Sequence, residues 1–234
     1  MGRPLTDYEK YIRTEELLAL QKPADGLAHH DELQFQIVHQ VSELWMKLVE
    51  HEVTAANSAM QGNDIAATLA SLARVQKLQI LLHDQLSLLD TMAPGAYMKI
   101  REVLGRGSGQ ESPGFKAMCR LPDGMWSAFL ELLAQRAIAL RTIYDNPEQQ
   151  RDLFLVAEAL LDFDQNLQAW RYRHLLLVYR QIGSETLSLK GKTSDLLVDG
   201  MKHRFFPALW QIRDELFAEW TRLHPSGAEP GHYG

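Results

Sequence analysis

Apolar residues recur at helical spacing along most of the chain, and no segment alternates convincingly at the period of two that a half-buried strand requires. The clearest example covers residues 30–61, where one apolar stripe contains Phe35, Val38, Val41, Trp45 and Leu48. A second apolar set, formed by Leu33, Ile37 and Leu44, lies on another side of the same segment. A helix with apolar residues on several sides is typical of the centre of a bundle. The pattern therefore predicts an all-α helical bundle.

Glycine, proline and capping residues divide the rest of the chain into further helices. We expect these helices over residues 8–20, 64–89, 94–104, 123–144, 147–182 and 195–223, the last interrupted at Pro207. Polar loops are expected at 105–114 and 183–193, and a frayed tail at 225–234. No internal repeat or composition shift marks a boundary, so residues 1–234 are predicted to form a single helical domain.

Composition narrows the classes of function. The 24 basic and 30 acidic residues give a net charge of −6, which does not favour a nucleic-acid partner. Cys119 is the sole cysteine, so neither an internal disulfide, a cysteine-based zinc site nor an iron–sulfur cluster fits. The N-terminal residues lack an apolar signal segment, and no run approaches membrane-spanning length. We therefore expect a cytoplasmic protein without a membrane partner.

Two histidines lie on apolar helix faces. His39 shares a face with Phe35, Ser42 and Met46, and His174 lies on the stripe formed by Leu167, Trp170, Leu177 and Val178. A haem needs only one or two axial ligands and an apolar slot, so a lone histidine in such a stripe suits a haem. Taken alone, each histidine is more often a hydrogen-bonded interior residue. Spacing by itself leaves both interpretations open.

Arg101 follows Tyr97 by one helical turn and precedes the glycine- and serine-rich loop. An arginine fork beside free backbone N–H groups can bind a carboxylate. A surface ion pair is the simpler alternative. The five tryptophans are most simply explained by packing in the core or at an interface.

Four ordered segments resemble the tryptophan 2,3-dioxygenase family. AHHDELQFQIVHQVSELWMKL (residues 28–48) resembles the distal helix of that family, and DTMAPGAYMKIREVLGRGSGQES (residues 90–112) its substrate-arginine segment. LQAWRYRHLLLVYRQIG (residues 167–183) resembles its proximal haem helix, and LTDYEKYIRTEELL fits its N-terminal helix. The resemblance covers roughly half the chain and implies an all-α bundle of the tryptophan/indoleamine dioxygenase type with a buried b-type haem.

Roles follow from the resemblance, position by position. His174 matches the proximal ligand of the iron in haem b (iron protoporphyrin IX), and His39 the distal histidine that hydrogen-bonds the indole N–H. The resemblance further implies a substrate-binding set in which Phe35 packs on the indole ring and Arg101 binds the carboxylate, together with Tyr97, Ser108 and Gly109. Tyr8 and Tyr11 match residues that enter a neighbouring subunit's pocket. The N-terminal helix within residues 1–22 is therefore expected to reach a second copy in a homo-oligomer, a dimer or more usually a tetramer.

The sequence departs from the family pattern in two places. The stretch between Arg101 and His174 is several dozen residues shorter than is typical. The family's TGG-type loop after the proximal helix is here SETLSLKGKT, with Ser188 at the threonine position followed by Leu189 and Lys190. A serine hydroxyl can keep one hydrogen bond, but the close backbone approach allowed by glycine is lost, and a nearby lysine repels a substrate ammonium.

These features leave more than one function open. The resemblance favours dioxygenation of the indole ring of L-tryptophan or a substituted tryptophan by O2, to a product of the N-formylkynurenine type. The altered loop favours monooxygenation to a 2-oxindole or a hydroxylated aromatic amino acid. A haem-binding sensor or carrier without catalysis is a third hypothesis, and a haem-free interaction protein a fourth. The combination of His39, Tyr97 and Arg101 argues against a carrier, which needs no carboxylate-binding site.

Overall fold

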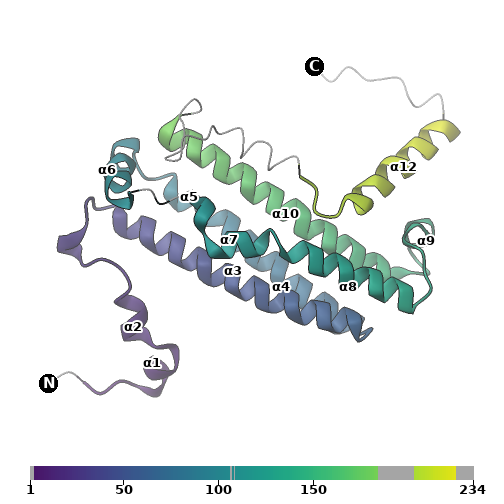
Figure 1. Ribbon diagram of the computed structural model, residues 1–234, viewed down its shortest axis with the longest axis horizontal. Helices are drawn as coiled ribbons and strands as arrows, with labels where there is room; N and C mark the ends of the chain where they lie inside the picture. Colours follow the sequence, from purple (N-terminus) through teal and green to yellow (C-terminus); the bar gives the residue numbers. More distant parts are fainter. Residues whose placement is uncertain (1–2, 106, 108, 184–202, 225–234) are drawn as a thin grey trace.

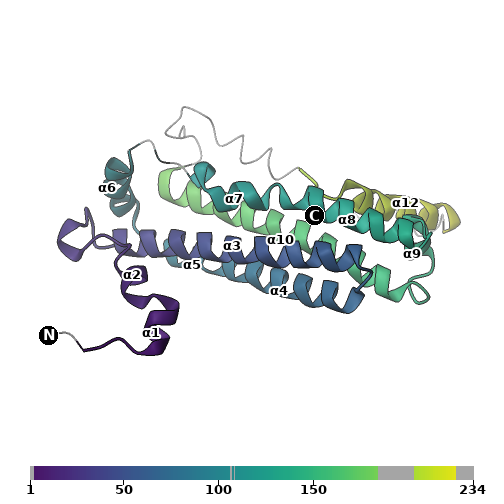
Figure 2. The same cartoon turned by 60° about the horizontal axis from the view of Figure 1, so that its bottom comes forward.

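The computed structural model describes residues 3–105, 107, 109–183 and 203–224, and every regular element within these ranges is helical. The prediction of an all-α fold is therefore confirmed. Long helices α3 (Glu32–Gln61), α4 (Ile65–Asp84), α8 (Leu121–Gln135) and α10 (Arg151–Ile182) lie side by side and form the body of the bundle (Figures 1 and 2). Their facing sides bury a continuous apolar core, which includes Val49, Val53, Met60, Leu72, Val75, Phe129, Leu132, Val156, Leu160 and Phe163.

Further helices lie toward the two ends of this bundle. At one end, α5 (Leu86–Leu89), α6 (Pro94–Leu104), η2 (Gly109–Glu111) and α7 (Pro113–Met118) follow α4 in the chain. At the other end are α9 (Leu140–Asp145) and α12 (Pro207–Leu223), and α12 projects outward (Figure 1). Proline at the first turn of α6, α7 and α12 fixes these starts, because proline needs no N–H partner there. Asp64 caps α4 by accepting a hydrogen bond from the Ala67 N–H at 3.0 Å.

Three expected helices are broken where the sequence pattern predicted continuity. The segment 8–20 forms α1 (Asp7–Ile12) and α2 (Thr14–Leu18), because Arg13 adopts a left-handed conformation with φ of 54°. The segment 123–144 breaks between α8 and α9, where Ala137 has φ of 52°. The segment 64–89 divides at Gln85 into α4 and α5. A non-glycine residue with positive φ cannot continue a right-handed helix, so the chain changes direction at the first two positions.

A smaller apolar cluster lies at the α5–α6 end of the bundle, separate from the main core. It consists of Val38, Leu86, Leu89, Met92, Ala96, Ile100 and Leu177, contributed by α3, α5, α6, α10 and the α5–α6 connection. Phe35, Tyr97 and Trp170 pack against it and are only partly buried. This cluster brings residues from the segments 28–48, 90–112 and 167–183, which are far apart in the sequence, to one place.

The sequence pattern led us to expect that α3 is enclosed on all sides, but in the structure one side of this helix is open. Leu33, Ile37, Leu44 and Leu48 have exposed fractions between 38% and 50%. Nearer the N-terminus, α1 and α2 lie away from the bundle (Figure 1). The second apolar set of α3, together with Leu48 from the first stripe, therefore forms an outer face of the chain.

One described stretch, Ile65–Leu89, is long and apolar enough by composition to cross a membrane. This stretch comprises α4 and α5, and the inner face of α4 packs against α3 and α10 in the bundle. Length and composition alone are weak evidence for a membrane span, because the core helix of a bundle meets the same test.

Candidate functional site

A cavity of about 650 Å³ opens between α3, α5, α6, α7 and α10. Its volume is within the range of small-molecule and cofactor sites. Most of its wall is apolar, with Val38, Met46, Leu86, Leu89, Met92, Leu104, Phe115, Trp170, Leu177, Val178 and Ile182 among the lining residues. Polar side chains also reach the wall, among them His39, Glu43, Arg101 and His174, together with Gln40, Ser42, Tyr97, Ser112, Arg171 and Gln181.

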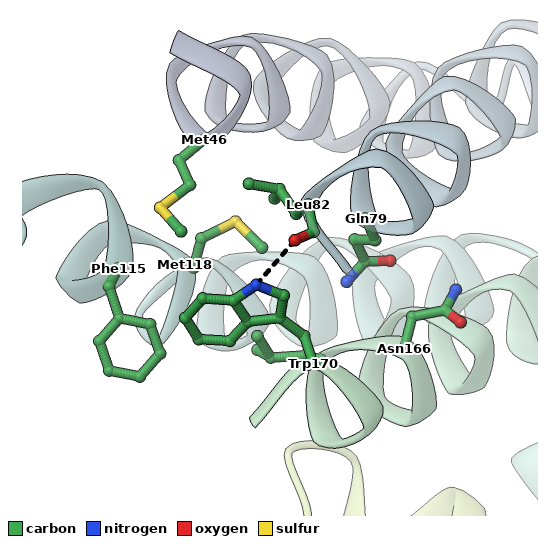
Figure 3. Close-up of a pocket in the computed structure, with 8 residues that line it drawn as sticks. Met46, Gln79, Leu82, Phe115, Met118, Asn166 and Trp170 are labelled. Atoms are coloured by element: carbon green, nitrogen blue, oxygen red, sulfur yellow. Dashed lines mark hydrogen bonds between the residues drawn. The ribbon is translucent and has the colours of Figure 1, made fainter. Parts of the chain in front are cut away.

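The imidazole of His174 enters this cavity from α10 and is held against Trp170, one helical turn earlier. The two rings are stacked, with centroids 5.4 Å apart and planes inclined by 10°. The Trp170 indole N–H donates to the Leu82 carbonyl at 3.1 Å, and Figure 3 shows this bond beside a small apolar space lined by Met46, Phe115 and Met118. Trp170 is therefore fixed by α4, and its ring in turn limits the orientations open to His174.

Burial, with a smaller contribution from the nearby His39, lowers the pKa of His174 to about 4. The ring is consequently neutral at pH 7 and keeps a lone pair on one nitrogen. Neither ring nitrogen of His174 hydrogen-bonds to another residue within the described ranges. A neutral imidazole with a free nitrogen in an apolar cavity has the properties that an axial haem ligand needs.

His39 enters the same cavity from α3, and its tautomer follows from its hydrogen bond. The Nδ1 atom lies 2.6 Å from the Phe35 carbonyl oxygen, which can only accept, so Nδ1 carries the proton. The open cavity leaves the ring accessible to solvent, but the many protein atoms around it still reduce its hydration. This desolvation lowers the pKa of His39, and the smaller effects of the Phe35 carbonyl and the Glu43 charge oppose that change. The neutral ring therefore presents Nε2 as an acceptor. The Phe35 ring lies 4.1 Å from it between centroids.

Arg101 and Tyr97 reach the cavity from consecutive turns of α6. The Tyr97 ring centroid lies 6.3 Å from that of Phe35, which brings α6 against α3. Burial raises the pKa of Tyr97, and the positive charge of Arg101 opposes that rise. In the part of the chain that the structure describes, Arg101 makes no ion pair or hydrogen bond through its guanidinium, so its N–H donors are free to bind a ligand.

The remaining predicted substrate residues fall into three groups. Gly109 lines the cavity. Tyr8 and Tyr11 lie on α1, are 70% and 88% exposed, and do not line the cavity of their own chain. Ser108 and Ser188 lie outside the described residues.

Sequence reasoning missed several residues of the cavity wall. Gln181 is 7% exposed and donates to the Leu89 and Met92 carbonyls at 3.1 Å each, which ties α10 to the α5–α6 connection. Arg171 lies over the Phe115 and Phe205 rings and donates to the Cys119 sulfur at 3.1 Å. Glu43 also lines the cavity and lies four residues, about one helical turn, after His39. This spacing puts the two side chains on one face of the helix and could have predicted Glu43 as a cavity residue. For Gln181 and Arg171 the partners are remote in sequence, and no local pattern indicated them.

The residues present fit a b-type haem. The cavity is large and mainly apolar, and a neutral histidine with free ring nitrogens stands on its wall. Such a group is held by one axial ligand and by apolar packing on the macrocycle. His174 would supply the ligand, and Leu177, Val178 and Trp170 on the same helix would contribute apolar contacts.

Fold and site together define an all-α protein with a histidine-lined cavity suited to haem and a small organic substrate. The sequence profile of the tryptophan 2,3-dioxygenase family matches residues 2–121. Proteins named tryptophan 2,3-dioxygenase are similar over nearly the whole chain. The protein of Serratia proteamaculans is 29% identical, over 90% of this chain and 93% of the relative. The protein of Kineococcus radiotolerans is 30% identical, over 89% of this chain and 91% of the relative. The protein of Erythrobacter litoralis is 31% identical, over 88% of this chain and 97% of the relative. The chain belongs to the tryptophan 2,3-dioxygenase family and is an oxidoreductase.

Proposed function

We propose that this protein is a haem-dependent oxygenase that uses O2 to open the indole ring of L-tryptophan or a substituted tryptophan, to a product of the N-formylkynurenine type. The observation that carries the proposal is one cavity in which His39 and His174 from two helices meet a free Arg101 from a third. Family membership supplies the reaction type, haem-dependent dioxygenation of tryptophan.

Each cavity residue has a task in this reaction. Arg101 binds the carboxylate of the amino acid through two parallel N–H donors, a geometry that lysine cannot reproduce. Phe35 packs on the indole ring, and the unprotonated Nε2 of His39 accepts the indole N–H. His174 holds the iron of the haem, which supplies the redox chemistry that activates O2 when it is bound. The protein residues thus orient the indole and exclude water, and orientation accounts for much of the rate.

A monooxygenase is the alternative, favoured by the sequence at 184–193 rather than by the cavity. Ser188, Leu189 and Lys190 replace the family's TGG-type loop, which helps to hold the substrate ammonium. If the indole is held less firmly, one oxygen atom enters the product, giving a 2-oxindole or hydroxylated aromatic amino acid. The other atom leaves as water with two electrons and two protons from a reductant. A non-catalytic haem protein is less well supported, because it needs no free arginine at the cavity.

We further propose that the enzyme is a cytoplasmic homo-oligomer, a dimer or tetramer, in which 1–234 forms one domain. Two observations support the assembly: Tyr8 and Tyr11 are exposed on an N-terminal segment away from the bundle, and α3 carries an open apolar face. An apolar helix face of this kind is typical of a subunit interface. Light scattering should give a multiple of the 26.7 kDa chain mass at micromolar concentration. A fully active monomer would contradict this assembly.

The function is tested by loading the purified protein with haem and titrating it with L-tryptophan under anaerobic, reducing conditions. We expect an intense Soret band and a saturable spectral change on adding L-tryptophan. A protein that binds no haem would rule out the oxygenase and the carrier alike. A protein that binds haem but no aromatic amino acid would favour the carrier.

A further inference from the structure

Glu43 on α3 accepts hydrogen bonds from the segment that follows the predicted substrate arginine. One carboxylate oxygen accepts from the Ser112 hydroxyl, and the other accepts from the Gly114 N–H at 3.0 Å. These partners lie 69 and 71 residues away in the sequence. In the part of the chain that the structure describes, Glu43 forms no ion pair with a lysine or arginine. Neutral donors from the start of α7 therefore satisfy this carboxylate, and charge-assisted bonds of this kind are among the stronger ones in proteins.

The same contact is closely packed. A Cβ atom added at Gly114 would lie 2.7 Å from a Glu43 carboxylate oxygen and 2.9 Å from both Cβ and Sδ of Met46. Ser112 is also the N-cap of α7, because its hydroxyl accepts from the Phe115 N–H at 2.9 Å. The hydroxyl thus donates to Glu43 and accepts from α7 at once. Glu43, Ser112 and Gly114 form a single junction between α3 and the first turn of α7.

This junction continues into the cavity wall. Phe115 follows Gly114 directly, lines the cavity, and packs on Trp170 with ring centroids 5.4 Å apart. Trp170 in turn stacks on His174. On the other side, η2 packs against α7, and its Gly109 lines the cavity. The position of α7 consequently sets both the aromatic wall beside His174 and the backbone beside the arginine segment.

We propose that Glu43 is a positioning residue that anchors η2 and the first turn of α7 onto α3 and so shapes the substrate side of the cavity. The inference rests on the proposed function, because it takes an aromatic amino acid as the ligand of that cavity. Glu43 lies next to His39 on the same helix face, so one turn of α3 both presents the distal imidazole and holds the opposite wall.

The test compares Glu43→Gln, Glu43→Ala and Ser112→Ala in the haem-loaded protein. Glu50→Gln and Glu50→Ala are the matched controls, because Glu50 is an exposed glutamate of the same helix. We expect Glu43→Ala to weaken L-tryptophan binding about tenfold, equivalent to about 1.4 kcal/mol, with the Soret band retained and kcat changed far less than KM. Glu43→Gln keeps one acceptor oxygen, so its affinity for L-tryptophan should lie between those of wild type and Glu43→Ala.

Two further readouts separate positioning from general stabilisation. Hydrogen exchange of the Gly114 and Phe115 amides should accelerate in Glu43→Ala and Ser112→Ala, while core amides of α10 stay protected. The double variant should be no weaker in binding than Glu43→Ala, because both substitutions remove one junction. If Glu43→Ala does not fold, Glu43→Gln and Ser112→Ala carry the same test.

Unchanged L-tryptophan affinity and unchanged Gly114 exchange in these variants would overturn the inference, as would equal losses in the Glu50 controls. A proportional loss of haem, stability and kcat would also overturn it, because that pattern describes a residue that only stabilises the fold. If wild-type protein binds no L-tryptophan, the proposed function fails instead, and amide exchange alone then decides whether Glu43 anchors α7.

Discussion

Replacement of Arg101 by alanine should weaken binding of the amino-acid substrate through loss of its carboxylate partner. The guanidinium lines the cavity from α6 and makes no competing ion pair within the described ranges, so its donors do not have to be released before substrate binds. Removing one partner of a buried charge-assisted pair costs about 2–5 kcal/mol. Because Arg101 is half-buried, solvent screening places the cost near the lower end, at about 2–3 kcal/mol. This corresponds to roughly 30- to 150-fold in the dissociation constant of L-tryptophan.

The assay is an equilibrium titration followed by haem absorbance, with L-tryptophan and its decarboxylated analogue tryptamine. Wild-type protein should prefer L-tryptophan, and Arg101→Ala should bind the two compounds with similar, low affinity. Arg101→Lys should recover only part of the preference, because lysine keeps the charge but not the planar pair of donors. Lys99→Ala, at an exposed position of α6, is the matched control and should behave as wild type. An Arg101→Ala variant that still discriminates between the two ligands as wild type does would refute the carboxylate assignment.

Three further predictions concern the two histidines and the start of α3. His174→Ala should lose most of its haem, whereas a normal haem content with an unchanged ferric spectrum would show that another residue binds the iron. His39→Ala should keep haem and slow turnover about tenfold, because one neutral hydrogen bond contributes about 0.5–1.5 kcal/mol; a loss of 10²–10⁴-fold would indicate a general base instead. The buried Glu32 carboxylate accepts from Lys22 and from the Ala28 N–H, at 2.6 Å each, and the Lys22 bond is the main cause of its lowered pKa. A carboxylate with a lowered folded-state pKa stabilises the fold above its unfolded pKa and loses that contribution as pH falls through the folded value. Glu32→Gln should therefore be less stable than wild type at pH 7 in urea unfolding, with the difference shrinking below about pH 4.5; a difference independent of pH would exclude the ionised carboxylate as its source.

Local pattern predicted the helices well and their breaks poorly. The start of α4 after Asp64 and the span of α6 from Pro94 to Leu104 follow from capping residues and proline, which act locally. Arg13 and Ala137 adopt positive φ, although neither residue type favours that conformation. At the α8–α9 break, Arg136 donates to Asn63 and Asp152, which are remote in sequence, so the neighbouring residues do not predict that break. Arg13 lies between two short helices without buried residues, and the structure shows no packing that explains its conformation.

The candidate site was predictable to a similar extent. Helical spacing places Phe35 beside His39, and Trp170 beside His174, as the ring contacts show. It does not indicate that these pairs face one cavity, because that depends on how α3 and α10 pack. The resemblance to a known family supplied this convergence. The Gln181 contacts to Leu89 and Met92 and the Glu43 contacts to Ser112 and Gly114 join segments remote in sequence, and no local signal predicted them.

The central claim is that the cavity directs O2 onto the indole ring of an aromatic amino acid. Its most direct test is mass spectrometry of the product formed from L-tryptophan by the haem-loaded, reduced protein under ¹⁸O2. The proposed reaction predicts a product of the N-formylkynurenine type that carries both labelled oxygen atoms. A product with one labelled atom would select the monooxygenase alternative. A haem-loaded protein that incorporates no label from O2 into L-tryptophan or a methylated tryptophan would contradict the claim.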